Sequence, residues 1–203
     1  MACFRMTPFL AILFAVAPAA RASNTLMFVE AQRNGVAGVD GLAFASAVAV
    51  SPDGAHVYAT GFLDNALVAF SRDASTGMLT FVEVQRDGVG GVDGLGRPHS
   101  VALSPDGANV YVALSDIGRF NIPNSPATEP DPRVGGGLFA LRLENGERVW
   151  FTPPPPCGER KRCSPAQSAA VSAIPGVVFS GSVDGHLRAF STTTGAISVA
   201  TST

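Results

Sequence analysis

Short runs of apolar and β-branched residues, each bounded by turn signals, dominate the pattern of the chain. The turn Ser51-Pro52-Asp53-Gly54 is typical, because proline fixes φ at the second position and glycine accepts a positive φ. The pattern predicts a four-stranded antiparallel sheet of short strands joined by tight turns. Its strands are expected at Ala47–Val50, His56–Thr60, Ala66–Ser71 and Leu79–Gln85.

The same pattern returns twice more along the chain. The dipeptide Asp184-Gly185 is a strong hairpin signal, and Ser104-Pro105-Asp106-Gly107 repeats the first turn. Three adjacent sheets are therefore predicted, at Ala47–Gln85, Ser100–Phe151 and Ser168–Thr201, with almost no helix. Their remaining strands are expected at Ser100–Ser104, Asn109–Leu114, Gly137–Leu143, Glu147–Phe151, Ser168–Ala173, Gly176–Ser182, His186–Ser191 and Ala196–Thr201.

The segment Phe28–Leu42 is repeated 53 residues later as Phe81–Leu95. A repeat of about this length is typical of the blades of a β-propeller. We therefore predict an all-β partial β-propeller of about three four-stranded blades plus one leading strand, Thr25–Gln32. Because known propellers close with four to eight blades, three blades leave exposed sheet edges. The chain is expected to be a fragment, a truncated product or a subunit that joins further blades of another chain or self-associates.

A fixed spacing between a hairpin glycine and an outer-strand residue suggests how the blades pack on one another. The last hairpin of each predicted blade contains a glycine, and an outer-strand residue follows it four positions later. These residues are Phe81, Trp150 and Val199. An aromatic side chain at this position is expected to pack one blade on the next.

Composition and charge narrow the function classes. Hydrophobic residues make up 46% of the chain and charged residues only 15%, which supports a buried core. The 22 glycines and 15 prolines favour turns over long helices. A formal charge of −2 gives no sign of nucleic-acid binding.

Residues 1–22 are predicted to be a signal peptide. Arg5 precedes a short apolar run, Phe9–Ala17, and the small residues Ala20 and Ala22 frame a cleavage site. An uncleaved anchor or a buried strand is the alternative. No other run is apolar and long enough to span a membrane, so the mature protein is expected to be periplasmic or secreted, without a membrane span.

Cleavage would leave two cysteines, Cys157 and Cys163. An even pair in an exported protein predicts a disulfide. A metal site is the weaker alternative, because two cysteines without nearby histidine or cysteine partners make at most half a zinc site. No metal ligand set is predicted.

Two long segments interrupt the strand pattern. Asp116–Arg133 contains four prolines without periodicity, and Thr152–Pro165 contains four consecutive prolines with both mature cysteines. Both are predicted to be surface loops, which often hold functional residues. The run Arg160-Lys161-Arg162 in the second loop is expected to be solvated.

The residues most often used in catalysis give weak signals here. His56 and His186 stand beside turns and His99 beside Pro98, so a plain polar role is favoured over catalysis. Asp40 and Asp93 occupy equal places in the repeat, which favours capping of a glycine-rich turn over acid–base or calcium chemistry.

Residues 23–114 resemble the lactonase-type seven-bladed β-propellers of bacteria. The phrase Leu79–Gly88 and the two Ser-Pro-Asp-Gly turns before Val-Tyr carry this resemblance. Residues 115–134 are predicted to form a proline-rich loop between this part and the next. The resemblance implies a propeller and, as one function, hydrolysis of a sugar lactone.

Residues 135–203 resemble a second propeller family, the pyrroloquinoline-quinone (PQQ)-dependent alcohol dehydrogenases of the polyvinyl-alcohol dehydrogenase group. Gly136–Trp150, Cys163–Ser168 and Ser180–Ala189 carry the resemblance, and Ala140, Gly146 and Trp150 fit that family's docking repeat. It implies a PQQ site with calcium. The residues that this resemblance places near the quinone are Arg162, Ser164, Gln167 and Ser168.

Three functions follow from these resemblances. The chain is interpreted foremost as a non-catalytic exported propeller, a fragment or truncated relative of a PQQ-dependent alcohol dehydrogenase. The alternatives are a lactonase-like hydrolase and a PQQ-dependent oxidoreductase that becomes active when further blades complete it. Quinone sites draw residues from most blades, so the isolated chain is expected to bind no cofactor.

Overall fold

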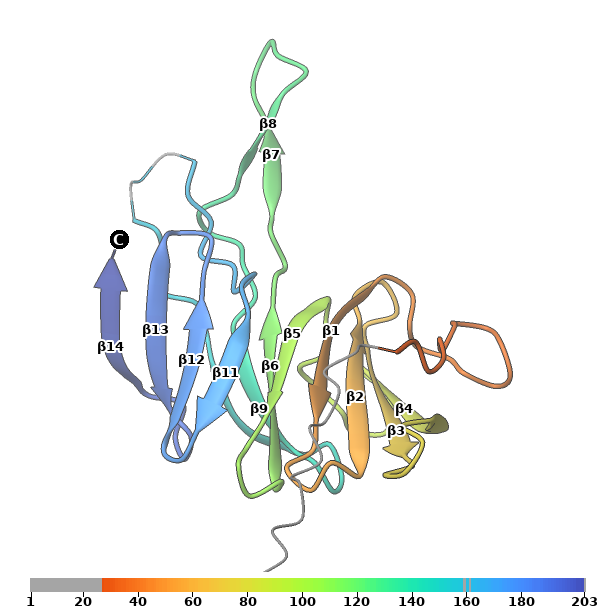
Figure 1. The fold of residues 1–203 in the computed structure, drawn as a ribbon. Coiled ribbons are helices and arrows are strands. Elements are labelled where there is room, and N and C mark those ends of the chain that lie inside the picture. The colour runs from red at the N-terminus through yellow and green to blue at the C-terminus, as the bar shows by residue number, and fades with distance from the viewer. Residues whose placement is uncertain (1–26, 159, 161, 203) are drawn as a thin grey trace, which may run out of the picture.

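A computed structural model describes residues 27–158, 160 and 162–202 of the chain. Its described residues form three four-stranded antiparallel sheets and one small hairpin, without a helix (Figure 1). The predicted signal peptide lies outside the described residues.

The three sheets follow one another along the chain. The first is β1 (Ala45–Val50), β2 (His56–Gly61), β3 (Ala66–Arg72) and β4 (Leu79–Arg86). The second is β5 (Pro98–Leu103), β6 (Asn109–Leu114), β9 (Leu138–Arg142) and β10 (Arg148–Thr152). The third is β11 (Val171–Ile174), β12 (Val177–Gly181), β13 (His186–Ser191) and β14 (Ile197–Ser202). In each sheet, strands adjacent in this order pair antiparallel, and the first strands β1, β5 and β11 lie next to one another. The prediction of a partial propeller with three four-stranded blades is confirmed.

Local side-chain chemistry sets the inner hairpins. In the first sheet, the Ser51 hydroxyl accepts a hydrogen bond from the backbone N–H of His56 at 2.9 Å, and the Asp53 carboxylate accepts one from Ala55 N–H at 2.9 Å. Ser104 and Asp106 repeat these contacts in the second sheet, at 2.9 and 3.0 Å. The serine hydroxyls also donate to the aspartates and hold the pKa of both carboxyl groups below the usual range. These contacts fix the turns and thereby the registers of the strands they join.

Two apolar layers hold the sheets together. Between the first and second sheets lie buried side chains from both, among them Val110, Phe139 and Leu141. Between the second and third sheets lie Tyr111, Trp150 and Phe190. Strand alternation explains this, because Phe139 and Leu141 face the first layer while Leu138 and Ala140 face the second.

Trp150 joins the second sheet to the third, as predicted for this position. Its side chain is 8% exposed and stacks on Tyr111 with ring centroids 5.8 Å apart. Its indole N–H donates to the carbonyl of Thr192 at 2.9 Å, and the Thr152 hydroxyl donates to the carbonyl of Gly195 at 2.6 Å. Gly195 lies directly against the indole, and a side chain at this position would collide with the ring.

Phe81 does not pack the first sheet on the second, so that part of the prediction is wrong. It packs edge-on against Phe70, with ring centroids 6.0 Å apart, on the opposite face of its sheet. In the first sheet, Phe81 pairs with Phe70, and the next pair is Glu83 with Ala69, so the register irregularity follows Phe81 along β4. In the second sheet the irregularity comes before Trp150. Because one extra residue reverses the face of a strand, the two aromatic positions point to opposite sides. The side chain of Val199 lies outside the described residues.

The predicted leading strand is not formed in its described part, residues 27–32. The strands with which it would pair are absent from the described residues, so its backbone has no ladder to join. It is held to the first sheet by side chains instead: Gln32 donates to the carbonyl of Leu79 at 3.1 Å, and Glu30 accepts from the N–H of Leu79. The following loop covers the outer face of this sheet with Val39, which is 3% exposed.

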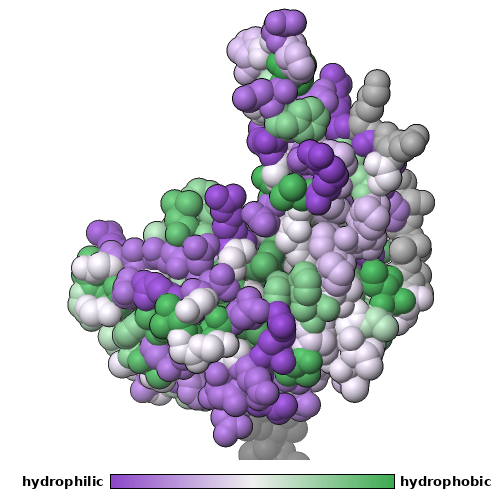
Figure 2. All heavy atoms as spheres, turned by 180° about the vertical axis from the view of Figure 1, so that it is seen from behind, coloured by the Kyte–Doolittle hydropathy of each residue, from purple (hydrophilic) through white to green (hydrophobic). Residues whose placement is uncertain are grey.

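The proline-rich segment after β6 contains a hairpin that its sequence did not predict. Its strands are β7 (Arg119–Asn121) and β8 (Thr128–Pro130). This hairpin projects above the sheets in Figure 1. Figure 2 shows that the surface of this projection is largely hydrophilic. The two strands are joined by three residue pairs. A three-residue strand is too short to show an alternation of apolar and polar residues, so the sequence pattern did not reveal it.

Candidate functional site

The loops that could hold a site gather at one end of the sheets. The β7–β8 hairpin, the loop from β10 to β11 and the turn from β12 to β13 all lie at this end (Figure 1). Side-chain contacts join these three segments. This end is the candidate functional site.

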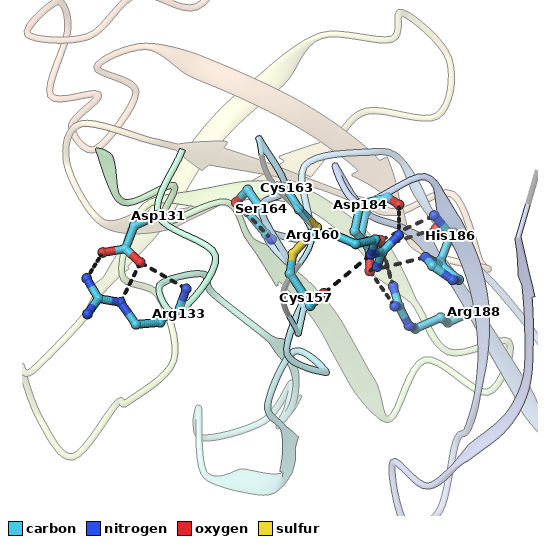
Figure 3. Close-up of a disulfide and its surroundings, with 11 residues drawn as sticks. Asp131, Arg133, Cys157, Arg160, Cys163, Ser164, Asp184, His186 and Arg188 are labelled. Atoms are coloured by element: carbon cyan, nitrogen blue, oxygen red, sulfur yellow. Dashed lines mark hydrogen bonds and ion pairs between the residues drawn. A yellow bond between two sulfur atoms is a disulfide. The ribbon is translucent and has the colours of Figure 1, made fainter. Parts of the chain in front are cut away.

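A disulfide between Cys157 and Cys163 closes the loop from β10 to β11, as the sequence predicted (Figure 3). The two Cα atoms are 6.0 Å apart, and the cysteines are 4% and 7% exposed. The side chain of Arg160 donates to the carbonyl of Cys157 at 3.3 Å and to the carbonyl of Asp184 at 3.3 Å. The loop is therefore closed on itself and tied to the β12–β13 turn.

Two residues of the basic run in this loop, Arg160 and Arg162, are paired where the sequence indicated only solvation. Arg162 lies 3.2 Å from the carboxylate of Glu129 in β8, and Arg160 lies 3.7 Å from that of Asp184. Both arginine side chains are more than half exposed, so each ion pair contributes at most about 1 kcal/mol. The acidic partners are far away in sequence, which is why the run alone did not reveal them.

Asp184 is the centre of a buried polar cluster in the third sheet. Its side chain is 1% exposed and lies 2.6 Å from a guanidinium nitrogen of Arg188, which is itself buried. Burial raises the pKa of the Asp184 carboxyl, but hydrogen bonds from Arg188 and Ser182 and the charge of Arg188 outweigh it and hold the pKa below its usual range. Asp184 therefore stays ionised at neutral pH and fixes the β12–β13 turn.

The imidazole of His186 lies at the edge of this cluster. Its Nδ1 atom is 3.2 Å from an Asp184 oxygen, but the two atoms lack hydrogen-bonding geometry. Nδ1 is therefore a buried atom without a hydrogen-bond partner among the described residues. The other histidines are elsewhere: His56 lies beside Tyr58, and His99 meets the ring of Phe62 edge-on at 6.5 Å. The three histidines therefore do not form one site, and their plain polar role stays a prediction.

Another ion pair lies just after the β7–β8 hairpin. Arg133 contacts both oxygens of Asp131, at 2.9 and 2.8 Å (Figure 3). These hydrogen bonds lower the pKa of Asp131 to about 2 and raise that of Arg133. The backbone N–H of Asp131 donates to the carbonyl of Gly118 at 2.8 Å, and this hydrogen bond closes the base of the hairpin.

The four residues that the sequence places near a quinone contact different neighbours. Arg162 pairs with Glu129, Ser180 donates to Gln167 Oε1 at 2.7 Å, and the hydroxyls of Ser168 and Ser115 are 2.8 Å apart. Ser164 is fully buried and accepts a hydrogen bond from Ala166 N–H at 3.3 Å. Each of these side chains thus has a contact of its own within the described residues. Their assignment to quinone binding stays a prediction.

The repeated aspartates have structural partners that the sequence analysis missed. Asp40 lies 2.9 Å from a guanidinium nitrogen of Arg86, and Asp93 lies 2.5 Å from one of Arg148. Asp40 also accepts the N–H of Gly41 at 2.8 Å, which fits the predicted role in a glycine-rich turn. Each aspartate thus ties its loop to an outer strand. Arg86 ends β4 whereas Arg148 begins β10, so the repeat of the sequence did not reveal these partners.

Two further features are absent from the described part of the chain. Histidines, cysteines and acidic residues do not gather there in groups of three or more that would hold a metal ion. Likewise, it contains no helix of the length and hydropathy needed to cross a membrane.

Comparison with known proteins supports two relationships. Polyvinylalcohol dehydrogenase from Pseudomonas sp. is 44% identical over 100 residues, which cover 47% of this chain and 14% of that protein. Polyvinylalcohol dehydrogenase from Sphingopyxis sp. (strain 113P3) is 41% identical over 96 residues, covering 45% of this chain and 13% of that protein. The chain thus matches about one seventh of the length of these relatives.

Among solved structures, the structure of U3-55K superposes with a TM-score of 0.50. It covers 78% of this chain and 39% of that one at 12% identity, which speaks for the fold alone. The family model described as "Lactonase, 7-bladed beta-propeller" matches residues 15–122, more than half of the chain. This chain therefore belongs to the family of lactonase-type seven-bladed β-propellers, and it is also similar to part of the polyvinylalcohol dehydrogenases.

Proposed function

We propose that the chain is an exported, non-catalytic propeller protein, a fragment or truncated relative of a PQQ-dependent alcohol dehydrogenase. The observation that carries this proposal is the separate engagement of the candidate quinone residues. Gln167 is 1% exposed and bound to Ser180, while Arg162 pairs with Glu129 on the surface. A quinone would have to compete with these contacts, and a cofactor on the axis of a ring needs contacts from several blades. Losing three or four hydrogen bonds to charged groups, at about 1.5–3 kcal/mol each, costs many orders of magnitude in affinity.

Export is proposed on two grounds. The segment 1–22 has the charge and apolar pattern of a signal peptide. The Cys157–Cys163 disulfide suits an oxidising compartment such as the periplasm or the cell exterior. In the cytoplasm, a disulfide of this kind would be kept reduced.

Titration of the purified mature chain with PQQ and calcium tests the proposal. We expect no binding at micromolar quinone and no dye reduction with an alcohol. Stoichiometric binding, or turnover of an alcohol, would contradict it. Arg162→Ala and Gln167→Ala are the test variants: if binding occurs at the predicted residues, both lower it, whereas Arg33→Ala, at an exposed arginine in the loop before the first sheet, leaves it unchanged.

The family match favours lactone hydrolysis as the second candidate function. It is tested by the release of acid from a sugar lactone at constant pH, measured against the same buffer without protein. Hydrolysis above this background that is lost when His99 is replaced by Ala would favour a lactonase, because His99 borders a cavity of about 350 Å³ beside the inner strands β1, β5 and β11. A PQQ-dependent activity that appears only after further blades are added would favour the third candidate, an oxidoreductase completed by another chain.

A further inference from the structure

A groove lies between the second and third sheets, at the end of the sheets opposite the candidate functional site. One wall is the β5–β6 turn with the end of β9, and the other is the β11–β12 turn with the β13–β14 hairpin. These turns lie at the lower end of the sheets in Figure 1. The volume of the groove, about 630 Å³, is within the range of small-molecule sites, roughly 300–1,000 Å³. The groove shares no residue with the cavity beside His99.

The contact between the first and second sheets contains the same place, and there the space is almost filled. Tyr58 and Tyr111 correspond, because each pairs with an alanine of the next strand. Leu143 and Thr192 correspond as well, because each stands three residues before the glycine of its last hairpin. Leu143 packs against the apolar layer, and the cavity that it lines measures only about 40 Å³. At the shorter, polar Thr192, the equivalent space is open.

Tyr111 places a buried hydroxyl group at this groove. The residue is 1% exposed, and its ring stacks on Trp150. Its hydroxyl forms no hydrogen bond with a described residue, although Tyr111 lines the groove. Burial and then the charge of Asp106, another lining residue, raise the pKa of this hydroxyl, so it stays protonated at neutral pH. Because a buried hydroxyl without a partner is unfavourable, its partner is expected to come from the groove.

Four further polar side chains line the groove. Asp106 is ionised, because a hydrogen bond from the Ser104 hydroxyl lowers the pKa of its carboxyl. Arg142 supplies the opposite charge, so the groove favours neither an anion nor a cation. The side chains of Asn109 and Thr192 form no hydrogen bond with a described residue, so their polar atoms are available to a ligand.

This set of groups defines the chemistry of the ligand. The carboxylate only accepts hydrogen bonds and the guanidinium only donates them, whereas the amide and the hydroxyls do both. A ligand hydroxyl also donates and accepts, so several hydroxyls on one neutral molecule match the whole set. Exposed Val149 and Pro175 offer apolar surface to the carbon skeleton between those hydroxyls. Closely spaced hydroxyl groups on a carbon skeleton are the chemistry of a saccharide.

We propose that this groove binds a neutral saccharide, with Tyr111, Asp106 and Thr192 among the groups that hold it. This inference goes beyond the proposed function, because it concerns the other end of the sheets. It holds whether or not the chain binds a quinone or hydrolyses a lactone.

Calorimetric titration of the mature chain with neutral trisaccharides tests the proposal. The probes are maltotriose, cellotriose, laminaritriose and xylotriose, and we expect saturable one-to-one binding of at least one of them at millimolar concentration or below. Trp150 stacks on Tyr111 and donates to the carbonyl of Thr192, so binding in the groove should also change the tryptophan emission. If all these sugars fail to bind, or if the zwitterion triglycine binds more tightly than each of them, the proposal is overturned.

Tyr111→Phe and Tyr58→Phe are the matched variants. Each removes one hydroxyl group and keeps the ring, but only Tyr111 lines the open groove. Losing one hydrogen bond should weaken binding by Tyr111→Phe about threefold to tenfold, while Tyr58→Phe binds like the wild type. Wild-type affinity in Tyr111→Phe, or an equal loss in the two variants, would contradict the proposal.

Thr192→Leu introduces the residue that fills the equivalent place in the first contact. It keeps the backbone carbonyl that accepts from Trp150, so the two sheets should stay docked while the larger side chain fills part of the groove. Saccharide binding should fall at least tenfold. Thr194→Leu, at an exposed residue of the same hairpin that does not line the groove, should leave binding unchanged. Equal affinities of these two variants would refute the assignment of the groove.

Discussion

Replacing Gly195 by alanine should disrupt the contact between the second and third sheets. Gly195 has a φ of +70°, and a Cβ atom there would lie 2.6 Å from Cε3 of Trp150 and 2.5 Å from the Thr152 hydroxyl. The left-handed backbone costs alanine about 1–2 kcal/mol. Forcing a methyl group into a packed contact adds about 1–3 kcal/mol.

Gly176→Ala separates these two costs. Gly176 has a φ of +83°, but a Cβ atom there would meet nothing within 4 Å. The free energy of unfolding of Gly195→Ala should therefore lie below that of Gly176→Ala by the packing cost alone, about 1–3 kcal/mol. For a chain of this size, each kcal/mol shifts Tm by about 2–4 °C.

Urea unfolding, followed by circular dichroism and by tryptophan fluorescence, measures the difference. Trp150 is the only tryptophan of the 203 residues, so its emission reports on this interface specifically. Adding Trp150→Leu should remove much of the extra cost of Gly195→Ala, because the colliding ring is gone. If Gly195→Ala and Gly176→Ala are equally stable and the emission is unchanged, the docking role of Gly195 is refuted.

Three further predictions concern the candidate site and export. Asp184→Asn should lower the free energy of unfolding by about 3–5 kcal/mol, because it leaves buried Arg188 unpaired, while Asp106→Asn in an exposed turn should cost far less. Since the folded-state pKa of Asp184 is lowered, its contribution is complete above its ordinary value of 3.8 and is lost as the pH falls below that value; an equal gap between wild type and variant at pH 7 and pH 2 would contradict this. Cys157→Ser should cost about 2 kcal/mol, measured by urea unfolding with and without reductant, and two free thiols in the folded, unreduced wild type would rule the disulfide out. Mass spectrometry of the exported protein should find Ser23 at its N-terminus, and a soluble cytoplasmic product starting at Met1 would disprove export.

The sequence predicted the sheets well because their turns depend on neighbouring residues. Ser51 and Asp53 bond the backbone within five positions, so their effect is visible in the sequence itself. The faces of the outer strands were harder to predict. Phe81 and Trp150 stand at the same distance from their hairpin glycines, but irregularities at different points of the register turn them to opposite sides.

The candidate site was predicted less completely, because its contacts join distant segments. The disulfide was evident from the cysteine count, but the partners of Arg160 and Arg162 come from two other loops. Ser164 and Gln167 were selected for their hydrogen-bonding groups, and both lie buried in internal contacts. A polar side chain in a loop does not reveal from sequence whether it faces a ligand or supports the loop.

The disulfide also determines what a proteolytic cut would do to the molecule. The run Arg160-Lys161-Arg162 lies between the two cysteines and is a target for trypsin-like enzymes. A cut within it separates the first two sheets from the third in the chain, yet Cys157 and Cys163 keep the two pieces covalently joined. On a non-reducing gel the nicked protein would migrate as a single covalent molecule, and only a reductant would release the piece that carries the third sheet.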